Sequence, residues 1–493
     1  MREILFQYDS VNPTTWAYLS SLLVIGLFFK FNRFWSVRNL DVMLLILLAP
    51  GLLMVYFGDQ NIAAARLAPA LDAEMALLDA NPMAPDAEAA EEDPAEAAPP
   101  TRLELSQRGN ALAKAGYIWL FCVSGMLLVR LFLDSTMVRR PLLEPNLTVG
   151  GMLFIGCSLF VFLSANIAVS QPSEASLRGV REATKQDPLA VRESLRHYGP
   201  GYRLLLMAPG IPTSPLEQHE APEQQETREA VIIAISKTIA ILGNLALVVG
   251  IVLVGYFHFD NARMGLGAAM LYLLMPYTAL YTGRIDHVLP AAFLIWAIFF
   301  YRRPVWAGIF MGLAIGTAYY PLFLLPLWIS YYWERGSARF TVGVLAMLAV
   351  LALSLIFTST DFESYMNQFR AMFGLWLPRQ GDGFTGFWDY YQNGQDYRIP
   401  VLTAFIALAG GLAIWPAQKN LGTLLSCTAA VMLAAQFWHA NDGTTYLAWY
   451  IPLMLLTIFR PNLEDRVALR VIGEGWRPRK AKNASGDPER KAA

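Results

Sequence analysis

Charged residues are scarce in this sequence of 493 residues: Asp, Glu, Lys and Arg together make up 16%, against 55% hydrophobic residues. So little charge cannot keep an apolar chain of this length in solution, which excludes an ordinary soluble protein. The formal net charge is -1, whereas nucleic-acid binding needs a basic surface that releases counterions from the phosphates. No nucleic-acid partner is therefore expected. Long apolar runs dominate instead, and they indicate a polytopic membrane protein.

Cysteine is equally rare, with three residues in the whole chain. Cys122, Cys157 and Cys427 lie inside apolar runs, show no paired spacing and have no histidine at ligand distance in the sequence. They are predicted to pack in the core rather than to form a disulfide or a metal site. Residues 1–13 are polar and lack a basic stretch before the first apolar run, so no cleavable signal is expected.

The apolar runs predict an all-α, polytopic transmembrane bundle of about thirteen spans, because only helices or closed barrels satisfy the backbone in lipid. The runs cover residues 15–31, 40–57, 116–133, 149–169, 230–257, 264–282, 288–301, 305–319, 322–333, 340–358, 400–415, 421–437 and 446–459.

Basic residues gather in alternate loops between these runs, and the tail from Arg460 onward is basic as well. The loop clusters are Lys30 with Arg33 and Arg38, Arg139 with Arg140, Arg302 with Arg303, and Arg335 with Arg339. Because cytoplasmic loops carry the excess of Lys and Arg, this alternation predicts an outer N-terminus and a cytoplasmic C-terminus. The expected location is the bacterial inner membrane, and an odd number of spans is required.

The chain then divides into six predicted regions. They are a two-span hairpin at 1–58, an acidic Ala/Pro-rich outer loop at 59–114, a second hairpin at 115–169, an outer loop with short helices at 170–229, a membrane core at 230–459 and a basic cytoplasmic tail at 460–493. Residues 71–100 hold nine acids and no Lys or Arg. Such a segment cannot bury enough apolar surface to offset its ordering entropy, so disorder is predicted. Binding of a divalent cation is the alternative.

The core contains an aromatic outer loop at 361–399. Its rings are interleaved with charges, and Arg370, Arg379, Trp376 and Trp388 are the candidate ligand-binding residues. Aromatic rings with polar groups suit a sugar, which offers an apolar face and a rim of hydroxyls. The same composition suits a loop that rests on lipid headgroups, and both interpretations stay open.

Ionisable residues cluster at the mouth of the apolar run that begins at 288. Arg284, Asp286 and His287 form the sequence Gly-Arg-Ile-Asp-His with Gly283 and Ile285. Asp286 is the candidate general base, and Arg284 pairs either with a ligand phosphate or with Asp286 alone. His287 is either a catalytic group or a residue of the membrane interface. Arg130 and Lys237, inside other runs, are attributed to side chains that reach the interface from near a helix end.

The order of segments 283–287, 301–316 and 319–328, followed by the Tyr-x-x-Trp-Tyr pattern within 439–456, resembles the glycosyltransferase-C superfamily, especially its mannosyltransferases. The resemblance covers roughly residues 264–459. It implies transfer of a sugar from a polyprenyl-phosphate donor to an acceptor on the outer face. It also implies a catalytic acid in an early outer loop, for which Asp9 and Asp59 are the nearest equivalents, and His439 and Asp442 lie on another outer turn.

Two other classes of protein remain open. The first is a non-catalytic scaffold or lipid-handling subunit with the same fold, and the second is a multispan transporter. An enzyme should hold Asp286 and another outer carboxylate around one cavity, whereas a scaffold should fill that space with apolar side chains. Membrane lipid and a polyprenyl-phosphate sugar are the expected partners. No metal site or certain cofactor is predicted, although a divalent cation stays an alternative, and the oligomeric state is left open.

The distribution of Lys and Arg generates a test of orientation. A reporter fused after Arg460 should lie in the cytoplasm, and one inserted near Pro85 should lie outside, because the basic loops stay on the cytoplasmic side. Paired alkaline phosphatase and green fluorescent protein fusions measure this. If both positions report the same side, the predicted orientation is wrong.

Overall fold

In this computed structural model the described residues are 11–79, 102–134, 143–170, 222–359, 361–373, 384–391, 394–416 and 419–461. Their regular secondary structure is helical, as predicted. The longer helices are α2 (Pro13–Phe28), α3 (Val37–Ile46), α4 (Leu48–Asp79), α5 (Arg102–Asp134), α6 (Val149–Val169), α10 (Pro222–His258), α11 (Ala262–Leu274), α13 (Ile285–Phe299), α14 (Pro304–Thr317), α16 (Ser337–Ser354), α17 (Phe362–Phe373), α18 (Gly394–Ile414) and α19 (Leu421–Trp438). The shorter elements are η1 (Phe31–Arg33), α12 (Pro276–Tyr281), η3 (Tyr320–Leu324), α15 (Leu325–Tyr331), η4 (Leu355–Thr358), η5 (Gly386–Tyr390), η6 (Leu447–Trp449) and α20 (Ile451–Phe459).

Within the described residues, 7 helical stretches are long and apolar enough to cross a membrane. They are Val37–Arg66, Arg102–Asp134, Val149–Val169, Ile233–His258, Ser337–Ser354, Asp396–Ile414 and Leu421–Trp438. Five shorter apolar helices accompany them: Pro13–Phe28, Ala262–Leu274, Ile285–Phe299, Pro304–Thr317 and Tyr320–Tyr331. The chain is therefore a helical protein with several membrane-length helices, and the total of thirteen spans stays a prediction.

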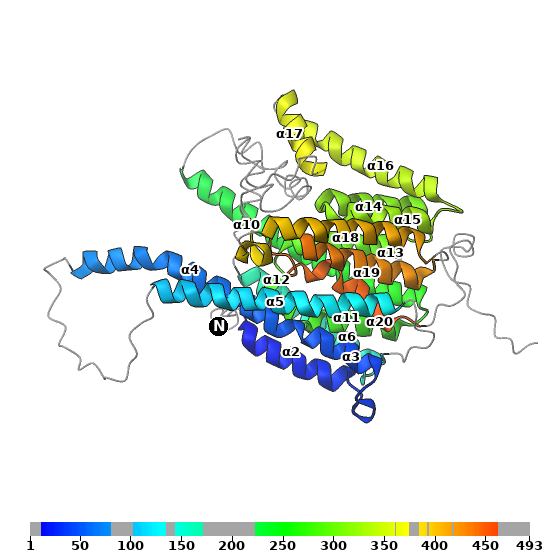
Figure 1. The fold of residues 1–493 in the computed structure, drawn as a ribbon, viewed down its shortest axis with the longest axis horizontal. Helices are drawn as coiled ribbons and strands as arrows, with labels where there is room; N and C mark the ends of the chain where they lie inside the picture. Colours follow the sequence, from blue (N-terminus) through cyan, green and yellow to red (C-terminus); the bar gives the residue numbers. More distant parts are fainter. Residues whose placement is uncertain are drawn as a thin grey trace, which may run out of the picture.

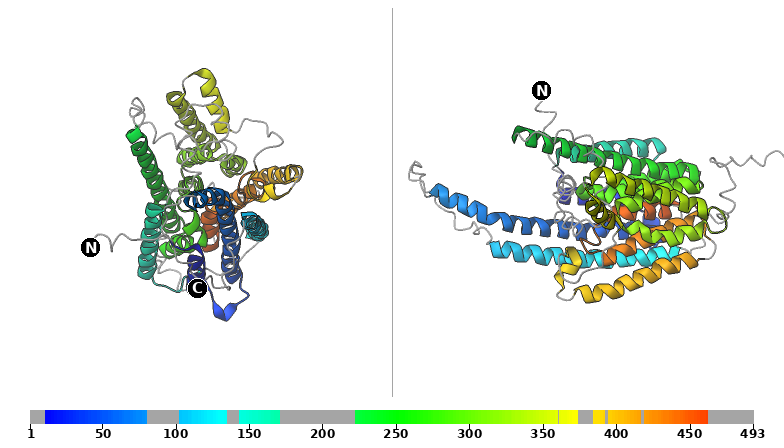
Figure 2. Two further views of the ribbon diagram at one scale, coloured as in Figure 1. Left: turned by 90° about the vertical axis from the view of Figure 1, so that its left-hand side faces the viewer. Right: turned by 90° about the horizontal axis from the view of Figure 1, so that it is seen from above.

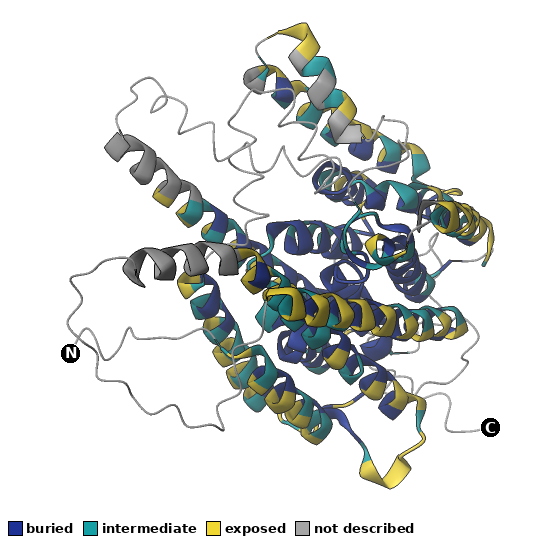
Figure 3. Ribbon diagram, turned by 60° about the vertical axis from the view of Figure 1, so that its left-hand side comes forward, coloured by how far each residue is buried: buried dark blue, intermediate teal, exposed yellow. Residues whose placement is uncertain are grey.

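The helices run side by side along one main direction (Figures 1 and 2). At one end α4, α5 and α10 extend beyond the bundle (Figure 1). These helices have 32, 33 and 37 residues, and at about 1.5 Å per residue each exceeds a hydrocarbon core roughly 30 Å thick. Buried residues concentrate in the middle of the bundle, and exposed ones on the outer helices (Figure 3). Many exposed side chains are large and apolar, among them Phe154 and Ile414, as a lipid-facing surface requires.

Proline divides two of the predicted runs. The run at 264–282 forms α11 and α12, which meet at Met275 in an extended conformation. Pro276 causes this break, since the residue before a proline disfavours the helical conformation. The run at 322–333 likewise forms η3 and α15, and a proline lies in the first turn of each. These short elements bring turns, and therefore polar backbone groups, close to the cluster around Arg284.

Two of the predicted outer loops are shorter than expected. The region 59–114 is helical at both ends, because α4 continues to Asp79 and α5 begins at Arg102. Its many Ala, Leu, Met and Glu residues favour helix, which the prediction of disorder overlooked. The aromatic loop 361–399 contains α17 and η5, and α18 begins within it at Gly394. Residues 80–101, 171–221 and 462–493 of the predicted loops and tail lie outside the described residues.

Glycines let α4 and α5 pack with their backbones in contact. A Cβ atom on Gly58 would lie 2.7 Å from the Ala113 backbone nitrogen, and one on Gly116 would lie 2.8 Å from the Val55 nitrogen. Small residues at such an interface allow close helix packing in lipid. Because Asp59 follows Gly58 directly, this packing fixes the position of Asp59 along the axis of α5.

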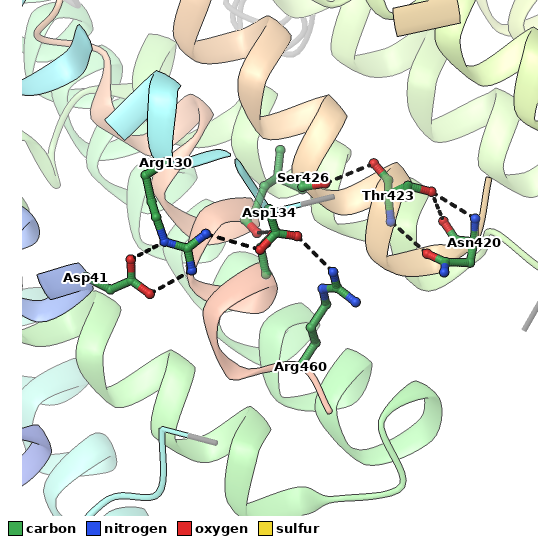
Figure 4. A network of polar contacts seen from close by, with 9 residues as sticks. Asp41, Arg130, Asp134, Asn420, Thr423, Ser426 and Arg460 are labelled. Atoms are coloured by element: carbon green, nitrogen blue, oxygen red, sulfur yellow. Dashed lines mark hydrogen bonds and ion pairs between the residues drawn. The ribbon is translucent and has the colours of Figure 1, made fainter. Parts of the chain in front are cut away.

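A buried ionic network joins α3, α5 and the end of α20 at the opposite end of the bundle (Figure 4). Arg130 Nε and Nη2 donate to the two carboxylate oxygens of Asp41 at 2.5 and 2.9 Å, and Arg130 Nη1 donates to Asp134 Oδ1 at 3.3 Å. Arg460 Nη2 donates to Asp134 Oδ2 at 2.8 Å. The expectation that Arg130 reaches the interface is wrong, because its charge is neutralised inside the protein. Arg460, assigned to the basic tail, is part of the packed interior.

The cysteines divide between two environments. Cys427 is buried, as predicted, whereas Cys122 and Cys157 are exposed on α5 and α6. Exposure of two small apolar residues on membrane-length helices places them on the surface that lipid would cover. The prediction that all three cysteines pack in the core is therefore correct only for Cys427.

The ionic network generates a test of stability. Asp134→Asn should lower the free energy of unfolding by about 3 kcal/mol, because it leaves Arg130 and Arg460 buried with too little negative charge. Denaturant titration in detergent measures the change. The exposed Glu334 provides the control, and Glu334→Gln should change stability by less than about 0.5 kcal/mol. Equal stability of the two variants would show that the network contributes little.

Candidate functional site

The turn between α12 and α13 places Arg284 and Asp286 in an ion pair that is largely buried, with side chains 16% and 10% exposed. Arg284 precedes the first residue of α13, and Asp286 lies in its first turn, where the helix dipole favours negative charge. Arg284 Nε donates to Asp286 Oδ1 at 3.3 Å, and Arg284 Nη2 donates to Asp286 Oδ2 at 2.8 Å. Asp286 is only 7% exposed. This pairing is one of the two alternatives that the sequence left open for Arg284, and the pair lies largely inside the protein rather than at an exposed surface.

His287 is held beside this ion pair by a tyrosine hydroxyl. Its Nδ1 lies 2.5 Å from Tyr277 Oη, and its ring stacks on Tyr281 with a centroid separation of 5.2 Å. Its Nε2 is 3.8 Å from Asp286 Oδ2. Trp449 Nε1 donates to the Asp286 backbone oxygen at 3.0 Å. His287 is fully buried, so it supports Asp286 from within rather than facing a ligand at the interface.

Asp442 approaches from the loop between α19 and η6. Asp442 has a φ of 47°, which few residues other than glycine adopt but Asp tolerates. Its Oδ1 accepts a hydrogen bond from Tyr117 Oη at 3.2 Å, and its backbone N–H donates to the Thr385 oxygen at 3.1 Å. Gly386, which follows Thr385 in the chain, has a φ of 78°, and a Cβ there would lie 2.9 Å from Asp442 Cα. The aromatic loop thus docks directly on the turn that presents Asp442.

A third carboxylate, Asp59, comes from α4. Asp59 interacts electrostatically with Asp442 and with Arg284. Unlike Asp286 it is exposed, and no hydrogen bond to its carboxylate occurs among the described residues. Three carboxylates from α4, α13 and the loop after α19 therefore surround one arginine. We call Asp59, Arg284, Asp286 and Asp442 the acid cluster, and the end of the bundle that carries it the Arg284 end.

The groups around the acid cluster are kept uncharged. His439 is buried and accepts a hydrogen bond at Nδ1 from the Asn441 N–H at 3.1 Å. Burial lowers the pKa of His439 to about 3, despite the opposing effect of that hydrogen bond, so the ring is neutral at physiological pH. Burial, reinforced by the charges of Asp59 and Asp389, raises the pKa of Tyr390 to about 12. Charge at this site therefore resides on the arginine and the carboxylates.

The remaining predicted residues lie in different places. Trp388 is buried, and its Nε1 donates to the Phe437 oxygen at 3.1 Å, so it fixes the aromatic loop on the bundle. Arg370 is exposed on α17, and no contact of it with the acid cluster is found. Trp376 and Arg379 lie outside the described residues. Of the predicted set, the structure brings together Asp59, Arg284, Asp286, His287, His439 and Asp442.

Several aromatic residues of the site were not predicted as functional. Tyr117 was not among the predicted site residues, yet its hydroxyl donates a hydrogen bond to Asp442. Tyr446 packs on His287 with ring centroids 4.3 Å apart, and Arg284 lies over the Tyr446 ring at 5.6 Å. The signal for Tyr446 was present, because it opens the Tyr-x-x-Trp-Tyr pattern that also contains Trp449. No pattern in the sequence pointed to Tyr117.

The acid cluster offers an accessible carboxylate beside a fixed positive charge. That combination can accept a proton from a hydroxyl and stabilise a neighbouring anion. Within the part of the chain that the structure describes, no three His, Cys, Asp or Glu side chains are placed so that they could hold a metal ion.

No protein-family model matches the sequence, and no curated protein matches it either.

Proposed function

We propose that this chain is a membrane glycosyltransferase that moves a sugar from a polyprenyl-phosphate donor to an acceptor on the outer face of the bacterial inner membrane. The observation that carries the proposal is the acid cluster: an exposed carboxylate, Asp59, lies near Asp442 and a half-buried arginine, Arg284, at one end of a membrane-length bundle. A scaffold would gain nothing from gathering three carboxylates, two of them accessible, around a single arginine, because like charges in close proximity oppose folding.

The proposed chemistry assigns different roles to the three carboxylates. The acceptor hydroxyl attacks the anomeric carbon of the sugar, its proton passes to Asp59, and the bond from that carbon to the phosphate oxygen breaks. The phosphate oxygen takes the bonding electron pair, and Arg284 stabilises the resulting charge. Asp286 is a positioning residue, because its carboxylate already accepts two hydrogen bonds from Arg284. Asp442 is oriented by Tyr117 and faces the same space.

Turnover of lipid-linked sugars by the full-length protein in proteoliposomes tests the proposal. Asp59→Asn should lower turnover about 100-fold or more, because the amide cannot accept the proton. Asp396 provides a matched control, since it is an exposed carboxylate at the start of α18, and Asp396→Asn should retain parental turnover. All variants should be compared at equal amounts of folded protein.

Two outcomes would contradict this assignment. Unchanged turnover in Asp59→Asn would remove Asp59 as the base. An absence of turnover in the parent across a panel of polyprenyl-phosphate sugars would favour the non-catalytic scaffold.

A further inference from the structure

A cavity of about 280 Å³ lies beside the acid cluster, between α2, α6, α10 and the turn after α12. Tyr56 on α4 and Arg284 line it. Because Tyr56 lies one helical turn before Asp59, the cavity and the acid cluster are neighbours on the same face of α4. The sequence analysis did not anticipate this cavity.

The lining of the cavity is polar and positively charged. Lys237 and Arg284 contribute charge, and no Asp or Glu is among the described residues that line it. Lys237 Nζ donates to the Ala168 oxygen at 2.7 Å, which leaves two of its three N–H groups for other partners. Arg284 uses Nε and Nη2 for Asp286 and makes no hydrogen bond through Nη1 among the described residues.

The buried hydroxyl of Ser236, beside the cavity, lacks a hydrogen-bond partner among the described residues. The residue is 2% exposed, its Oγ has no hydrogen-bond partner, and it lines the cavity. Serine and threonine in membrane helices normally donate to the carbonyl four residues earlier. Thr238 does so, with Oγ1 2.8 Å from the Ala234 oxygen, whereas Ser236 does not. A buried hydroxyl without a partner is costly, and an acceptor in the cavity would satisfy it.

We propose that this cavity binds a phosphate group, with Lys237, Arg284 and Ser236 as its hydrogen-bond donors. A phosphate carries negative charge and several acceptor oxygens, which matches two cations and an unpartnered hydroxyl. Lys237 lies one turn inside the membrane-length stretch Ile233–His258, and basic residues near the end of such a helix suit binding of lipid head groups.

This inference deepens the proposed function and rests on it for the identity of the ligand, because the donor of such a transfer carries a phosphate between its lipid and its sugar. The cavity would hold that phosphate while Asp59 and Asp442 face the sugar. Free phosphate shares the same chemistry, so the experiment must separate the two sources.

Binding without turnover tests the site. The probes are a polyprenyl phosphate that carries no sugar, in phosphatidylcholine nanodiscs analysed by native mass spectrometry, and inorganic phosphate titrated into the same samples. Lys237→Met should weaken binding of the polyprenyl phosphate at least about tenfold, because a charge-assisted hydrogen bond is lost. Ser236→Ala should weaken it roughly threefold. Lys114→Met is the matched control, since Lys114 is an exposed lysine outside the cavity that lies over the Tyr391 ring.

Each outcome decides between the alternatives. If excess inorganic phosphate leaves binding of the polyprenyl phosphate unchanged, the result supports a lipid-linked ligand. If inorganic phosphate competes with the polyprenyl phosphate, the result supports a site for the phosphate group itself. Equal affinity of Lys237→Met and the parent, with both proteins folded in a thermal melt, would overturn the proposed site. Binding without any transfer activity would retain the site and contradict the glycosyltransferase. Transfer that is unaffected in Lys237→Met would retain the enzyme and contradict the site.

Discussion

The positive charge of Arg284 is the constraint on which the Arg284 end depends. A guanidinium stays protonated in any protein environment, so its burial must be offset by negative charge. Asp286 supplies the direct pair, and Asp442 and Asp59 contribute through space. Meeting this requirement brings together the N-terminus of α13, an interior turn of α4 and the loop after α19. The arrangement that neutralises one arginine is also the arrangement of the proposed active site.

The two ends of the bundle handle buried charge differently. At the end of the bundle that carries Arg460, two arginines and two aspartates are connected by close hydrogen bonds, and each carboxylate is buried. At the Arg284 end, one arginine faces three carboxylates, and Asp59 stays exposed. A closed network fits a structural role, since every charge has a partner inside the protein. An open cluster with surplus negative charge and an adjacent cavity fits a ligand-binding role.

The sequence predicted the helical class and most of the helix positions, because hydrophobic run length is a strong signal in a membrane protein. Pairing of Arg284 with Asp286, which is local and spans two residues, was one of the two alternatives that the sequence left open. The sequence did not predict the partners of Arg130, because Asp41 and Arg460 are distant in the chain and only packing brings them together. Asp59 was selected through a family resemblance, but its proximity to Asp442 depends on the glycine-mediated contact of α4 with α5. The cavity beside Lys237 and Ser236 was not predicted, because a cavity has no sequence signature.

Thermal unfolding of Arg284→Gln and of Arg284→Gln combined with Asp286→Asn, in the same detergent, tests the central claim most directly. If Arg284 neutralises the acid cluster, the single variant should lose about 3 kcal/mol of stability, because it leaves the buried Asp286 carboxylate without a counter-charge. The double variant should recover at least about 1 kcal/mol of that loss, since it removes the uncompensated charge as well. A double variant no more stable than the single one would show that the charge of Arg284 does not hold this site together.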